Sequence, residues 1–181
     1  MPFVLIVIAV LVLGLLAIGV ATYVARPPLP PIADLPLTPL QRRAWAWLAV
    51  QLVITAAIVV ILAKAGPSRF WEDEAVRLPV TGLFVLGVAA YGAQFGLTYW
   101  QASRGKLVLD ERDRAILDRA PAAQVPAMLV TVAAWVAVLM ETYHSEGQVP
   151  VVFLVLIFWS CLFVISLALP AGILLGYRRG G

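Results

Sequence analysis

Five long runs of apolar residues, separated by short polar segments, dominate the pattern of this chain. A helix needs about 20 mostly apolar residues to cross a hydrocarbon layer about 30 Å thick. The runs that reach this length are residues 3–25, 44–63, 79–101, 125–143 and 149–177. They are continuous rather than alternating with a period of two, which excludes the strands of a membrane β-barrel. The pattern therefore predicts five transmembrane helices.

Prolines support these boundaries. Those at or just before the start of a run are Pro2, Pro39, Pro79, Pro126 and Pro150. Proline is tolerated there because the first N–H groups of a helix have no partner within it. Pro170 lies inside the run 149–177, so we expect a kink at which Ser166 or a neighbouring helix recovers the freed carbonyl.

The polar segments predict two connections on the same side of the bundle. Residues 26–40, RPPLPPIADLPLTPL, form a proline-rich linker for which polyproline II is the expected conformation. Its PxxP spacing is short and common, so we interpret the linker as a spacer rather than a recognition peptide. Residues 104–121 form a charged connector, which includes the sequence DERDRAILDR.

The connector predicts a short amphipathic helix on the cytoplasmic surface. Asp110 is a suitable N-cap, and Asp113 lies three residues later, where an acid completes a capping box. Ile116 and Leu117 supply an apolar edge. Alternating charges often serve only solubility, but here they favour docking of a protein partner over specific lipid binding, because acids nearly balance bases. The predicted docking residues are Asp110, Glu111, Arg112, Asp113, Arg114, Asp118 and Arg119.

The same segment carries a resemblance. LDERDRAILDRA, residues 109–120, followed by an apolar run, resembles a juxtamembrane D-E-R-D-x-x-I-x-x-x-A segment of small prokaryotic membrane proteins of unknown function. The resemblance covers only this segment and the run that follows it. It implies a multi-helix membrane protein and implies no catalytic residue.

Composition and charge support one membrane domain over residues 1–181. Hydrophobic residues make up 62% of the chain and charged residues 13%, against about 25% charged in soluble domains. With five spans, ten of the 13 basic residues fall on one side, and Lys64, Arg69 and Arg77 fall on the other. The positive-inside rule then predicts a multi-pass protein of the cytoplasmic (inner) membrane, with its N-terminus outside and its C-terminus in the cytoplasm. The net charge of +3 follows this asymmetry, so no nucleic acid partner is expected.

Catalytic chemistry has little basis in the residues present. Cys161 and His144 are the single residues of their types, which excludes the usual N/S metal cages within one chain. The sequence contains no glycine-rich phosphate loop and no hydrolase or metalloprotease motif. No ionisable residue lies at mid-depth in a predicted span. We therefore predict no enzymatic activity, no catalytic residue, no metal and no cofactor.

Polar and small residues in the spans predict helix packing. Gln51 and Gln94 fall at similar depths in neighbouring helices, where an amide–amide hydrogen bond is expected. Two GxxxG steps, Gly92/Gly96 and Gly172/Gly176, allow the backbones of two helices to approach closely. Within the chain such steps mean tight packing, and on an outer face they mean assembly. The pattern leaves both open.

These observations favour an all-α bundle that serves as a scaffold, accessory or assembly subunit. Its expected partners are the lipid bilayer and other membrane subunits or copies of itself. The alternative is a small oligomeric channel or transporter in which Gln51, Tyr91 and Gln94 line a path. An intramembrane enzyme is the third class of function. No residue in the sequence indicates the cofactor or lipid product that such an enzyme would require.

Overall fold

The computed structural model describes residues 37–105, 109–145 and 147–178. The predicted span 3–25 and most of the proline-rich linker lie outside these described residues. The described part is helical and contains no strand, which confirms the all-α prediction for it. The elements are α2 (Pro39–Ala65), α3 (Pro67–Glu72), α4 (Glu74–Ser103), α5 (Glu111–Arg119), the 3₁₀ helix η1 (Ala120–Ala123), α6 (Gln124–Tyr143) and α7 (Val152–Arg178).

Four stretches are long and apolar enough to cross a membrane, as the hydrophobic pattern predicts. They are Pro39–Ala65, Glu74–Ser103, Glu111–Tyr143 and Val152–Arg178. This property is consistent with a membrane protein.

Helix α4 begins earlier than the apolar run that predicted it. Its first residue is Glu74, so Pro79 lies inside the helix rather than at its start. The reason is the N-cap, where the Asp73 carboxylate accepts a hydrogen bond of 2.9 Å from the N–H of Ala75. A capped polar turn can thus precede the apolar residues in one continuous helix.

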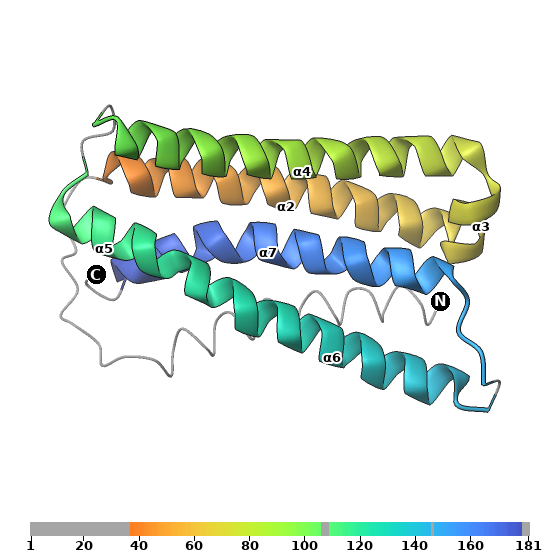
Figure 1. Ribbon diagram of the computed structural model, residues 1–181. Helices are drawn as coiled ribbons and strands as arrows, with labels where there is room; N and C mark the ends of the chain where they lie inside the picture. Colours follow the sequence, from red (N-terminus) through yellow and green to blue (C-terminus); the bar gives the residue numbers. More distant parts are fainter. Residues whose placement is uncertain (1–36, 106–108, 146, 179–181) are drawn as a thin grey trace.

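Helix α7 lies at the centre of the bundle (Figure 1). It packs against α2 on one side and α6 on the other, while α4 lies beside α2 and α3 joins these two at one end. In the most apolar window of α7, 50% of the residues are buried, compared with 11% in that of α4. Helix α4 therefore presents the most open surface among the described spans.

Aromatic rings fill the core near the α3 end. Phe84 of α4 stacks on Trp159 of α7 with 4.4 Å between ring centroids, and Phe70 of α3 meets the same indole edge-on at 5.4 Å. Such pairs add to the stability gained from burying their area. Trp159 is therefore half-buried and packs against the core of the bundle.

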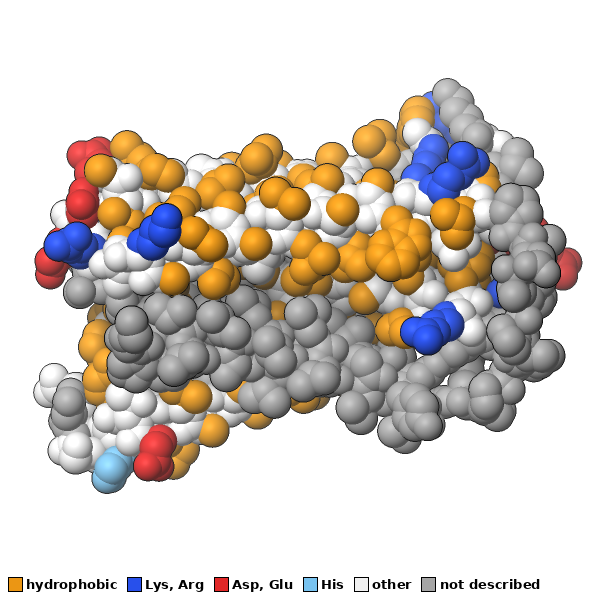
Figure 2. Space-filling model, turned by 180° about the vertical axis from the view of Figure 1, so that it is seen from behind, with side chains coloured by type: hydrophobic (Ala, Val, Ile, Leu, Met, Phe, Trp, Pro, Cys, Tyr) orange, Lys and Arg blue, Asp and Glu red, His pale blue; other side chains and the backbone are white. Residues whose placement is uncertain are grey.

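Charged side chains gather at the two ends, and hydrophobic side chains cover the length between them (Figure 2). Lys64, Arg69 and Arg77 belong to the α3 end. The basic residues at the opposite end, where α2 begins and α7 ends, are Arg42, Arg43, Arg104, Arg112, Arg114, Arg119 and Arg178. The helices thus place these arginines on one surface of the bundle.

Candidate functional site

Helix α5 forms a charged platform at the arginine-rich end. Its N-cap is Asp110, whose carboxylate accepts a hydrogen bond of 2.6 Å from the N–H of Asp113. Ile116 and Leu117 are buried against the bundle. The Tyr99 hydroxyl of α4 donates to the carbonyl of Leu117 at 3.3 Å. The cap and the apolar edge expected from the sequence therefore orient α5.

A hydrogen-bonded network fixes α5 to the ends of two spans. The Tyr177 hydroxyl donates to the Asp113 carboxylate, which is only 3% exposed. The Thr38 hydroxyl, at the N-cap of α2, donates to the Tyr177 oxygen at 2.8 Å. The Arg112 guanidinium donates to the Tyr177 carbonyl at 3.1 Å and lies 5.6 Å from the centre of its ring. Residues 139 positions apart in the chain are joined in this way.

This network divides the predicted docking residues into two groups. Asp113 is buried and Arg112 is half-buried, and both bind Tyr177 within the chain. Their side chains therefore serve internal packing. The predicted docking residues that are exposed are Asp110, Glu111, Arg114, Asp118 and Arg119. Docking itself stays a prediction for these residues.

Sequence reasoning missed Tyr177 and Thr38 as members of this network. Tyr177 is the last residue of the predicted span 149–177, where an aromatic ring is typical of the membrane surface. Thr38 belongs to the linker that we interpreted as a spacer. The available signal was the Thr38–Pro39 pair, since threonine before proline is typical of a helix N-cap. The Gln41 N–H donates to the Thr38 hydroxyl at 3.2 Å, so α2 begins there.

The two GxxxG steps face different surroundings. A Cβ atom built on Gly172 would lie 2.9 Å from the carbonyl oxygen of Ala120, and one on Gly176 would lie 2.8 Å from Ile116. This step therefore serves tight packing of α7 against α5 and η1. A Cβ on Gly92 or Gly96 would meet no atom of the described residues within 4 Å. That step lies on the open face of α4.

Gln51 does not make the expected bond with Gln94. Its side-chain amide is 1% exposed and donates from Nε2 to the carbonyl of Gly87 at 3.0 Å. Helices α2 and α4 can approach there because Gly87 has no side chain: a Cβ on it would lie 3.2 Å from Phe163 and 3.3 Å from Ile54. The glutamine thus holds the α2–α4 pair through a backbone carbonyl.

Gln124 joins three helices, a role that sequence reasoning missed. Its Nε2 donates to the Tyr91 hydroxyl of α4 at 2.8 Å and to the Ile165 carbonyl of α7 at 3.1 Å. Ile165 lies five residues before Pro170, whereas the carbonyl that the proline leaves without its helical donor belongs to Ser166. Recovery of that carbonyl stays a prediction. The Ser166 hydroxyl instead donates to the carbonyl of Phe163 at 2.8 Å.

Trp135 and Ser160 form a buried polar pair between α6 and α7. The Trp135 indole N–H donates to the Ser160 hydroxyl oxygen at 2.7 Å, and Ser160 donates to the carbonyl of Ile157 at 2.9 Å. Trp135 is 1% exposed. The ring therefore packs inside the bundle with its N–H bonded, as buried indoles require.

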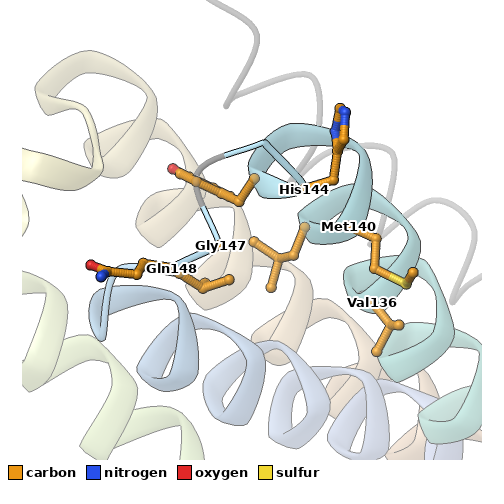
Figure 3. Close-up of a pocket in the computed structure, with 8 residues that line it drawn as sticks. Val136, Met140, His144, Gly147 and Gln148 are labelled. Carbon is orange, nitrogen blue, oxygen red and sulfur yellow. The ribbon is translucent and has the colours of Figure 1, made fainter.

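A surface hollow of about 360 Å³ lies between the end of α6 and the segment that leads to α7. Its lining includes Val136, Met140, His144 and Gln148. In Figure 3 the His144 ring points away from Val136 and Met140. In the described residues no group of three or more His, Cys, Asp or Glu side chains could hold a metal ion. The surface that lines the hollow is almost entirely apolar.

The comparisons with known proteins reveal one limited similarity. The isocitrate dehydrogenase kinase/phosphatase of Rhodopseudomonas palustris (strain BisB5) is 35% identical over 80 residues, which are 44% of this chain and 13% of that protein. No protein-family model matches the chain, and no solved structure matches it. The chain therefore spans a small part of the length of the protein it resembles, and the match identifies no family.

Proposed function

We propose that this chain is a non-catalytic integral membrane subunit, a scaffold or accessory protein that packs against other membrane protein chains through the open face of α4. The observation that carries the proposal is the surroundings of Gly92 and Gly96. Within the part of the chain that the structure describes, a Cβ atom on either glycine would have no atom within 4 Å, and only 11% of the apolar window of α4 is buried. A GxxxG step exposed in this way lets the backbone of another helix approach closely.

The polar side chains of the spans support a packing role. Gln51, Gln124 and Trp135 each donate a hydrogen bond that joins neighbouring helices. A second contact surface is α5, whose exposed charges project from a helix that the Asp113–Tyr177 bond holds in place. Partner subunits would then meet α4 within the membrane and α5 at its surface.

The proposal includes a topology in the cytoplasmic membrane. Residues 3–25 form a fifth span, α5 lies on the cytoplasmic surface, and the N-terminus is outside. The arginine-rich end, which contains Arg42, Arg104 and Arg178, faces the cytoplasm. Support comes from the bias of basic residues toward cytoplasmic loops.

The test is assembly in native membranes. The chain is extracted in mild detergent, sized, and analysed for the chains that copurify with it. Gly92→Leu together with Gly96→Leu should reduce the large complex to the isolated chain, because the leucines prevent close approach of a partner helix. The control is Ala133→Leu, which introduces a leucine at an exposed position of α6. An isolated wild-type chain, or a complex that the glycine variant leaves intact, would contradict the proposal.

A channel or transporter is the alternative. Of its expected lining, the Tyr91 hydroxyl accepts a hydrogen bond from Gln124, and Gln51 donates to Gly87. Both groups thus hold helices together, which favours the packing role. A solute flux in liposomes containing the purified chain, abolished by Gln94→Leu, would reverse this preference.

A further inference from the structure

Thr55 differs from three other threonines of the apolar helices in the use of its hydroxyl. Thr98, Thr131 and Thr142 each donate to the carbonyl four residues earlier, at 2.8 Å. Thr55 is 7% exposed, and its Oγ1 has no hydrogen-bond partner among the residues that the structure describes. A buried hydroxyl without a partner costs free energy, and the usual local solution was available here on the same helix. The Thr55 side chain is therefore directed toward something other than its own backbone.

Thr55 lines a cavity where α2, α6 and α7 meet. Trp135 and Ser160 contribute to the same wall, and the rest of the lining is apolar. The cavity offers about 30 Å³ to the centre of a water molecule, and roughly 10–15 Å³ is enough to hold one. It is much too small for a lipid headgroup or a drug-sized ligand. Its volume matches one or two waters.

The polar atoms around this cavity can hold a water molecule. Ser160 Oγ accepts from Trp135 and donates to Ile157, which leaves it one free lone pair. The Thr55 hydroxyl can both donate and accept. Buried waters in proteins typically make two to four such bonds.

We propose that Thr55 and Ser160 hold an internal water molecule that links α2 to α7. The water donates to the Ser160 oxygen and exchanges a hydrogen bond with the Thr55 hydroxyl. In a hydrocarbon layer no bulk solvent can satisfy these groups. A bound water satisfies them at little cost in entropy. This inference is independent of the proposed assembly role.

Water-edited solid-state NMR tests the site directly. The full-length chain, labelled at threonine and serine, is reconstituted in deuterated lipid, and the transfer of magnetisation from water is measured. Thr55 should receive it several-fold faster than Thr131, which is also buried, at 0% exposed, but is bonded to its own backbone. Equal, slow transfer at both threonines would overturn the proposal.

Two variants show whether the Thr55 hydroxyl holds the water. Thr55→Val keeps the shape of the side chain and removes the hydroxyl, so water transfer to Ser160 should fall to the level of Ser166, a buried serine bonded to its own helix. Thr55→Ser retains the hydroxyl and should retain the transfer. Undiminished transfer to Ser160 in the valine variant would show that Thr55 plays no part in binding water.

Discussion

Single residues in this protein acquire their roles from the surface that they face. Gly92 and Gly172 belong to the same GxxxG pattern, yet Gly172 lies against the backbone of Ala120 and Gly92 against no described atom. Asp113 and Asp110 both belong to the charged connector, yet Asp113 is buried on Tyr177 and Asp110 is exposed. Residue type and spacing suggest a set of roles, and contacts in space select among them.

The glycine pair gives a matched test of this statement. Gly172→Ala would place its Cβ 2.9 Å from a backbone oxygen that cannot move away easily, and we expect a loss of about 1–3 kcal/mol in the free energy of unfolding. Gly92→Ala adds a methyl group to open space, so we expect no loss and a gain of up to about 1 kcal/mol. Unfolding of the isolated chain in detergent measures both. Equal effects of the two changes would contradict the difference in packing.

Tyr177→Phe tests the network at α5. It removes the hydroxyl that donates to Asp113 and leaves a buried carboxyl without its partner. The expected loss of stability is about 1–3 kcal/mol. Tyr143→Phe is the control, because the Tyr143 ring packs on Phe153 with 5.5 Å between centroids and this contact survives the change. Unfolding in detergent should separate the two variants, and similar losses would refute the role of the network.

Helices are held here by a few side chains that reach another element. Gln124 of α6 binds Tyr91 of α4 and the backbone of α7, so one amide fixes three helices. Helix α5 is held by its apolar edge and by Asp113 rather than by its length of nine residues. The relative positions of the elements thus depend on a small number of polar contacts.

Gln124→Leu should reveal the strength of this contact. The variant loses two hydrogen bonds at once, and interhelical bonds in membranes are worth about 0.6 kcal/mol on average and up to about 1.7 kcal/mol each. We expect a measurable loss of stability in detergent unfolding. Gln94→Leu is the control, because Gln94 is half-buried and takes part in the described hydrogen bonds only through its backbone. A larger loss at Gln94 would contradict the assignment.

At the scale of the whole molecule, charge and packing are distributed unequally. The arginines gather at the end that contains α5, and the span that faces the bundle least is α4. The uneven distribution of arginines bears on the orientation of the chain in the membrane. The open face of α4 bears on its assembly with other chains. Each leads to a measurement on the intact chain.

Labelling of cysteines from one side of the membrane tests the orientation. In a Cys161→Ala background, Ser103→Cys places a thiol at the arginine-rich end, and Ser145→Cys places one at the other end, both at exposed positions. An impermeant maleimide added to intact cells should label position 145 only, because the proposed topology places the arginine-rich end in the cytoplasm. Labelling of position 103 alone would contradict the proposed topology and indicate the opposite orientation.

The sequence by itself determined the helical class, four described spans close to their observed positions, and the Asp110 cap of α5. These features depend on local hydropathy, on proline and on capping chemistry, which act over a few residues. Only the tertiary structure decided that Gln51 meets Gly87, that Tyr177 meets Asp113 and that one GxxxG step is internal while the other is open. Those outcomes depend on how each helix is rotated about its axis. Apolar runs with little difference between their faces leave that rotation to packing among all the helices.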